Sequence, residues 1–96
     1  LVLNGGEHNG RALVPRACVS RMTQPCAIAP FYGRLMWLNS NGTQFPGAST
    51  RASFMVGAGG HYTWIEPEFD AVVVVRWLDS PSVPLFMQSV AAALRD

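Results

Sequence analysis

Residues 53–67, SFMVGAGGHYTWIEP, decide how the chain folds, because strand-forming residues here flank a cluster of glycines. The runs 53–56 and 61–66 have the β-branched and aromatic content of a β-strand. We predict one strand with a break between its halves, where Gly57, Gly59 and Gly60 fall. Glycine weakens the interior of a strand, because it has no side chain to pack and loses much conformational freedom on folding. Two explanations account for glycines at these positions. Either a ligand lies close to the backbone, or the chain forms a β-bulge or tight hairpin there.

The flanking segments predict an α+β fold around this strand. Pro15 opens a short helix over 15–22, and residues 32–39 read as a strand. Residues 71–78, AVVVVRWL, form a nearly continuous apolar run, which predicts a central strand buried on both faces. The expected architecture is an antiparallel three-stranded sheet with a short N-terminal helix and a C-terminal helix packed on it.

The last segment has the spacing of a C-terminal amphipathic helix. The predicted apolar stripe consists of Leu85, Phe86, Ser89, Val90, Ala93 and Leu94. This helix can cover one face of the sheet, and no other segment is an obvious cover for the second face. The first residues, LVLNGG, resemble the end of a helix that is stopped by Asn and Gly. Both features lead us to expect a segment of a longer protein.

Length and charge exclude several classes of protein. The 96 residues suffice for one small domain, and the net charge of +1 is spread without a basic stripe, so no nucleic-acid partner is expected. The longest apolar run, 71–75, is far too short to span a membrane. Cys18 and Cys26 have neither CxxC spacing nor a nearby histidine, so we expect no metal site. Two buried thiols are the simpler reading of these cysteines, and a disulfide stays open.

Complete catalytic motifs are absent from the sequence. There is no Gly-x-Ser-x-Gly, no His-Glu-x-x-His and no phosphate-binding loop, and GAGG opens no helix, so no cofactor is expected. His8 and His61 are read as surface or packing residues. Glu66, Glu68 and Asp70 bracket a turn and are read as a solvated edge.

The order YGRLMWLN, a Pro/Gly loop, SFMVGAGGHYTWIEPEFDAVVVV and a final helix resembles the C-terminal part of the serine β-lactamase-like hydrolases. That superfamily includes class C β-lactamases, penicillin-binding proteins, esterases and 6-aminohexanoate-dimer hydrolases. The upstream stretch LVLNGGEHNGRALVPRACVSRMTQP is similar to the preceding segment of the same family. The resemblance covers essentially the whole chain and is nearest to the esterase and amide-hydrolase branch. It implies that residues 1–96 are the C-terminal part of a larger hydrolase domain, whose compartment, a bacterial cytoplasm or periplasm, the sequence leaves open.

The resemblance also implies roles for individual residues. The family's Lys-Thr-Gly triplet, or its variants, would fall on Met55, Val56 and Gly57. The backbone N–H of Ala58 would form half of the oxyanion hole for a small-molecule ester or amide. The other residues expected to contact substrate are Gly59, Gly60 and His61.

Departures from the family pattern limit what this chain can do by itself. It contains no lysine, so it has no Ser-x-x-Lys, and neither Tyr32 nor Tyr62 lies in a Tyr-x-Asn motif. The Met-Val-Gly triplet also lacks a cation that could hold a substrate carboxylate. We therefore expect one wall of an active site, with the nucleophile on the missing N-terminal part of the same domain. Phe45, Trp37 and Trp64 could line this wall, although core packing is the simpler role for both tryptophans.

Two alternatives from other functional classes stay open. The sheet edge and the glycine break could bind a peptide or partner subunit by strand addition, as a noncatalytic β-module. The chain could also be an inactive homologue that keeps the fold as a scaffold.

Overall fold

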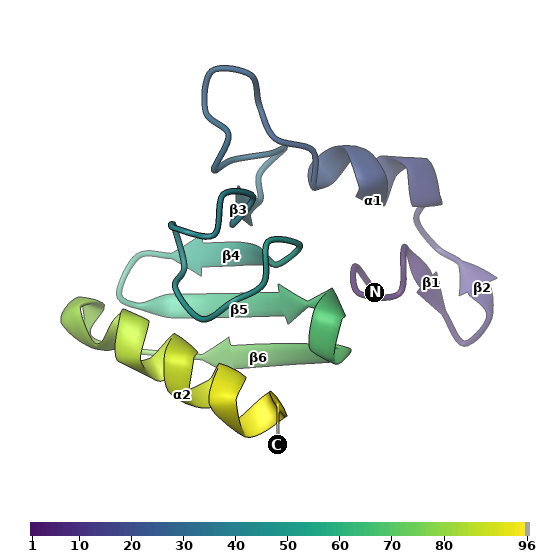
Figure 1. Cartoon of the computed structure of the whole chain (residues 1–96). Coiled ribbons are helices and arrows are strands. Elements are labelled where there is room, and N and C mark those ends of the chain that lie inside the picture. Colours follow the sequence, from purple (N-terminus) through teal and green to yellow (C-terminus); the bar gives the residue numbers. More distant parts are fainter. Residues whose placement is uncertain (96) are drawn as a thin grey trace.

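The computed structural model describes residues 1–95 and contains two antiparallel sheets and two α-helices (Figure 1). The predicted α+β class is confirmed, but the main sheet has four strands rather than three. The elements are β1 (Glu7–His8), β2 (Arg11–Ala12), α1 (Arg16–Met22), β3 (Trp37–Leu38), β4 (Ser53–Gly57), β5 (His61–Glu66), β6 (Ala71–Val75) and α2 (Val83–Arg95). Two short 3-10 helices, η1 (Pro67–Phe69) and η2 (Ser80–Ser82), precede β6 and α2.

The main sheet is a meander with the strand order β3-β4-β5-β6. The prediction of one glycine-broken strand over 53–66 is wrong, because β4 and β5 are separate strands that pair antiparallel, with Gly57 opposite His61. Residues 58–60 form the three-residue turn between them. Gly59 and Gly60 have φ values of +99° and +86°, which L side chains rarely adopt. The hairpin alternative thus accounts for the position of these glycines.

The N-terminal third contains a short hairpin and the predicted helix. Asn9 and Gly10, with φ values of +50° and +77°, connect β1 to β2 as a tight hairpin. The helix predicted over 15–22 is present as α1. Residues 1–6 form hydrogen-bonded turns rather than the end of a helix. Cys18 and Cys26 are free and exposed, so the reading of two buried thiols is wrong.

The strand predicted over 32–39 is reduced to the two residues of β3. Leu35 has a φ value of +63°, and this turn conformation interrupts the extended chain. Trp37 pairs with Phe54, and Leu38 pairs with Ser53. Because β3 is so short, it covers only the first two residues of β4.

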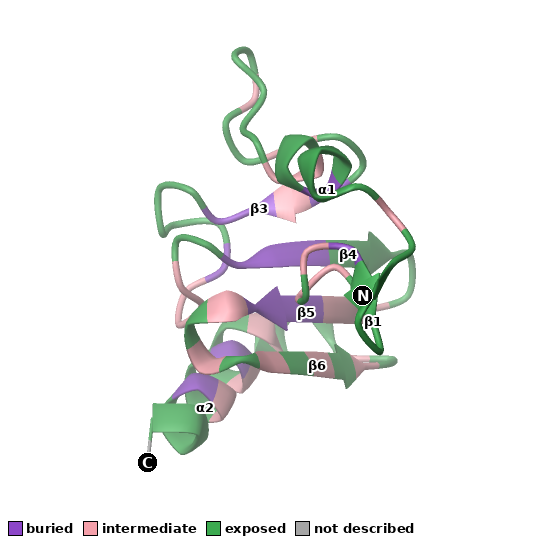
Figure 2. Ribbon diagram, turned by 90° about the vertical axis from the view of Figure 1, so that its right-hand side faces the viewer, coloured by how far each residue is buried: buried purple, intermediate pink, exposed green. Residues whose placement is uncertain are grey.

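The core lies between one face of the sheet and α2 (Figure 2). Phe54 and Trp64 are cross-strand neighbours on this face, which we call the helix face, and they pack with Met87 and Ala91 of α2. The predicted stripe of α2 is shifted: Met87 and Ala91 lie outside it and are buried, whereas Leu85 is exposed, and only Val90 of its members packs against the core. The side of α2 that packs is fixed by where the helix meets Phe54 and Trp64 on the sheet.

The opposite face of the sheet, the open face, is covered only at one end. Val2, Leu3 and Met22 pack against Met36, Leu38 and Ile65 there. The prediction of a central strand buried on both faces is wrong for β6, which lies at the edge of the sheet with Val72 and Val74 exposed. The expectation that one face lacks a cover is confirmed at these two valines.

Exchanging neighbouring valines of β6 for threonine tests this assignment of faces. Val73→Thr puts a hydroxyl against the core and should lower the free energy of unfolding by about 1–2 kcal/mol. Val74→Thr changes an exposed side chain and should alter it by less than about 0.5 kcal/mol. Urea unfolding followed by circular dichroism measures both variants. Equal losses for the two would contradict an open face at Val74.

Two buried polar side chains hold the loop of residues 39–52 to the sheet. The Asn39 amide donates to the carbonyls of Phe45, Ala48 and Ser49, and its oxygen accepts from the Phe45 N–H at 2.8 Å. The fully buried Glu66 carboxylate accepts from the Ser49 N–H at 2.9 Å and from the Ser49 hydroxyl. The reading of Glu66 as part of a solvated edge is therefore wrong, whereas Glu68 and Asp70 are exposed as expected.

Candidate functional site

The predicted site residues lie together on the β4–β5 hairpin. All of them except Ala58 line one or both of two hollows, which share Gly57 and Tyr62. The sheet hollow, on the open face, includes Met55, Val56, Gly57 and His61. The turn hollow, at the end of the hairpin, includes Gly57, Gly59 and Gly60. Ala58 is an exposed residue of the turn between these glycines.

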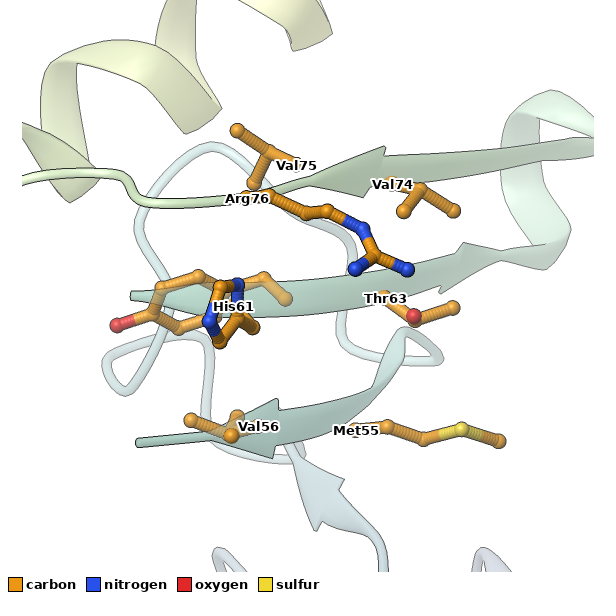
Figure 3. A pocket seen from close by; sticks show the side chains of 9 residues that line it. Met55, Val56, His61, Thr63, Val74, Val75 and Arg76 are labelled. Atoms are coloured by element: carbon orange, nitrogen blue, oxygen red, sulfur yellow. The ribbon is translucent and has the colours of Figure 1, made fainter. Parts of the chain in front are cut away.

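The sheet hollow has a volume of about 320 Å³ and a mixed apolar and cationic lining (Figure 3). Strand register places Met55, Thr63 and Val74 side by side across β4, β5 and β6. His61 lies opposite Gly57, so the glycine leaves a gap in the wall where another residue would place a side chain. The hollow therefore offers an apolar floor that is open toward the end of the hairpin.

Arg76 adds a positive charge to this hollow, and sequence reasoning missed it. Its guanidinium extends from the end of β6 toward Thr63 in Figure 3. Among residues 1–95, the one ion pair joins Arg16 to Glu7, so no carboxylate neutralises Arg76 there. A usable signal was present in the sequence, since Arg76 alone interrupts the apolar run of residues 71–78.

His61 is held by an aromatic contact rather than by hydrogen bonds. Its ring meets the indole of Trp77 edge to face, with the ring centroids 4.4 Å apart. Its Nδ1 atom is buried and has no hydrogen-bond partner in the described part of the chain. This contact supports a packing role for His61. No carboxylate or hydroxyl group orients its ring, as one would for a general base.

The turn hollow is larger, at about 590 Å³, and carries a different charge. Tyr62 and Trp77 supply its aromatic surface, and Asp79 supplies its only charged side chain among the lining residues. The backbone here is fixed by a hydrogen bond from the Leu78 N–H to the Gly60 carbonyl, 2.9 Å long. The segment after β6 is therefore tied to the glycine turn.

The outer edge of β4 is free beyond Phe54. The Leu38 N–H donates to the Phe31 carbonyl at 2.7 Å, so it points away from β4, and the neighbouring Trp37 is the residue that exchanges backbone bonds with Phe54. Alternation along the strand then turns the N–H and carbonyl of Val56 to the same outer edge as those of Phe54. In the part of the chain that the structure describes, no strand pairs with Val56 on that side.

The Ala58 N–H follows this edge. No backbone carbonyl among residues 1–95 accepts a hydrogen bond from it. Ala58 is exposed, and its neighbours Gly57 and Gly59 have no side chains to shield its N–H. The amide is therefore accessible to a ligand that approaches along the free edge of β4.

Aromatic residues flank the same edge on the helix face. Trp37, Phe45 and Tyr62 line a small recess of about 150 Å³ next to Val56. Phe45 is also part of the core, and Trp64 is buried at 1% exposure, which confirms core packing for Trp64. Trp37 is half-buried and packs against the core and the ring of Phe31. It therefore supports the core and also lines the recess.

Within residues 1–95, no three histidine, cysteine or acidic side chains gather closely enough to hold a metal ion. Neither described helix has the length and apolar character needed to cross a bilayer.

Comparison of the chain with models of protein families, with curated proteins and with solved structures finds no match.

Proposed function

We propose that this chain supplies the oxyanion-hole strand of a serine hydrolase that cleaves ester or amide bonds by acyl transfer. The observation that carries the proposal is the free edge of β4, which ends at the exposed and unbonded N–H of Ala58. An oxyanion hole needs an N–H that is fixed in place and open to a substrate carbonyl. The whole-chain resemblance to β-lactamase-like hydrolases assigns this same N–H to that role.

In this proposal the chain contributes electrostatics and positioning rather than the nucleophile. Serine attack on the substrate carbonyl creates a negative oxygen, and the Ala58 N–H donates a hydrogen bond to it. The oxygen re-forms the carbonyl as the alcohol or amine leaves, and water then releases the acyl group as a carboxylic acid. Because the sequence has no lysine, a Ser-x-x-Lys nucleophile would have to lie outside these 96 residues. The isolated chain is expected to be inactive.

The proposal predicts that removing one N–H lowers activity without changing the side-chain surface greatly. Ala58→Pro in the native, full-length product should reduce kcat/KM for a p-nitrophenyl ester about 100-fold, because proline has no N–H. The matched variant Ala58→Ser keeps the N–H and should stay within about threefold of wild type. Equal kcat/KM values for the two variants would contradict a role for the Ala58 N–H in the oxyanion hole.

Strand addition is the second candidate function, and the unpaired backbone groups of Val56 favour it. An extended peptide could pair with this edge and place a side chain in the recess next to Trp37. In that case the chain would bind a peptide without esterase activity in the native product. Protection of the Val56 amide from hydrogen exchange on peptide addition would support this candidate.

A further inference from the structure

We propose that Trp77 is a stacking platform for a planar aryl group of a ligand in the turn hollow. The inference rests on the proposed function only in taking the ligand to be an ester or amide. The substrate class is then an ester or amide that carries an aryl group, and Trp77 is the residue that selects the aryl group. Neither Trp77 nor the turn hollow was singled out by sequence motifs.

The conformation and exposure of Trp77 are unusual for so large an apolar residue. The residue is 77% exposed, and its φ value is +58°. A bulky residue in the left-handed region is a backbone outlier, and such strain concentrates at ligand-binding and active sites. Tryptophan also has the largest aromatic face available for stacking.

Contacts with the hairpin keep the indole in this position. His61 packs edge to face against it, and a Cβ atom on Gly59 would lie 3.1 Å from the indole ring. The next residue, Leu78, is hydrogen-bonded to Gly60. The ring is thus fixed against the turn on one side while most of its surface faces solvent.

The turn hollow has the size and surface for an aryl group. It is an open concavity of about 590 Å³, and Gly57, Gly59 and Gly60 put no side chains into it. Tyr62 adds a second aromatic ring to the lining. Gly57 and Tyr62 line both hollows, so the turn hollow adjoins the sheet hollow at the start of the turn.

A cationic ligand is the competing choice for two aromatic rings near Asp79. Two rings do not enclose a cation, whereas the exposed face of one indole is enough to stack a planar group. The aryl group is therefore the ligand chemistry that we favour, and a cation is an outcome of the test.

Nuclear magnetic resonance titration of the ¹⁵N-labelled chain tests the platform. Acetanilide is the planar probe, N-cyclohexylacetamide is its non-planar match, and tetramethylammonium is the cationic probe. We expect acetanilide to shift the indole N–H of Trp77 and the amides of Gly59 and Gly60 with one saturable constant. The cyclohexyl amide should bind at least threefold more weakly, because it cannot stack flat.

Variants distinguish the platform from a merely structural tryptophan. Trp77→Ala should weaken acetanilide binding at least fivefold, and Trp77→Phe should retain part of the affinity. Leu85→Ala, an exposed apolar residue on α2, is the matched control and should bind as wild type does. Thermal unfolding checks that each variant folds, and Trp77→Phe carries the comparison if the alanine variant does not.

The inference would be overturned by the absence of a saturable shift, by equal binding of the two amides, or by tighter binding of tetramethylammonium than of acetanilide. It would also be overturned if the Trp77 variants bound as wild type does, or if Leu85→Ala lost as much affinity as they do. The hydrolase proposal is tested separately, by the ester activity of Ala58→Pro. Acetanilide binding at Trp77 without esterase activity in the native product would uphold the platform and reject the hydrolase.

Discussion

Replacing Glu66 with alanine is expected to lower the free energy of unfolding by about 4 kcal/mol. The carboxylate is fully buried and accepts from Ser49, from the Trp64 indole N–H at 3.2 Å and from the Glu68 N–H at 3.2 Å. Alanine would leave these donors buried without an acceptor, which costs about 1–3 kcal/mol for each group that water cannot reach. The loop of residues 39–52 would also lose an attachment to β5.

Glu66→Gln is the conservative variant, and its loss should be about half as large, since one acceptor oxygen remains. Glu68→Gln is the control, because Glu68 is exposed and its side chain makes no hydrogen bond in the described structure. It should change stability by less than about 0.5 kcal/mol. The three variants are compared by urea unfolding. A loss below about 1 kcal/mol for Glu66→Ala would contradict the hydrogen-bonded, buried carboxylate.

Replacing Gly60 with alanine is expected to cost about 3–4 kcal/mol and to release the segment after β6 from the hairpin. The φ value of Gly60 is +86°, and an added Cβ would lie 2.0 Å from the Leu78 carbonyl oxygen. The left-handed conformation costs about 1–2 kcal/mol for an L residue. The rest of the cost comes from moving Leu78 away, which breaks its hydrogen bond to Gly60.

Gly10→Ala separates these two contributions. Gly10 also has a positive φ, +77°, but an added Cβ there would meet no atom within 4 Å. It should lose only the conformational part, about 1–2 kcal/mol. Unfolding free energies of both variants, with hydrogen exchange of the Leu78 amide, give the comparison. Equal losses with an unchanged Leu78 amide would contradict the close approach at Gly60.

Local signals in the sequence predicted the elements that depend on local chemistry. Pro15 predicts the start of α1, and the Asn9-Gly10 pair and Pro67 are turn signals that lie at the β1–β2 turn and directly after β5. Each of these residues restricts its own backbone, so neighbouring sequence is enough to read it.

Features that depend on distant segments could not be read in this way. The alternation in residues 53–66 is the same for one broken strand and for a hairpin, and only the register of Gly57 with His61 distinguishes them. The apolar run of β6 was taken as a central strand, although an edge strand with an uncovered face has the same sequence pattern. The phase of α2 depends on where it meets Phe54 and Trp64.

The candidate site was predicted in part for the same reason. The glycines located the hairpin at which the hollows lie, because glycine marks close approach of backbone. Arg76 and Trp77 were read as the end of a strand, and only the folded chain brings them beside His61 and Gly59. Glu66 appeared to be a solvated acid because its partner Ser49 lies 17 residues away.

The hydrolase proposal is tested most directly by labelling the native product in its source with a fluorophosphonate that reacts with catalytic serines. Intact mass and peptide mapping of the labelled protein are then measured together. The account predicts a protein much heavier than these 96 residues, with the label on the serine of a Ser-x-x-Lys motif. An unlabelled protein with the mass of these 96 residues alone would contradict it, and the free edge of β4 would then need a role in binding.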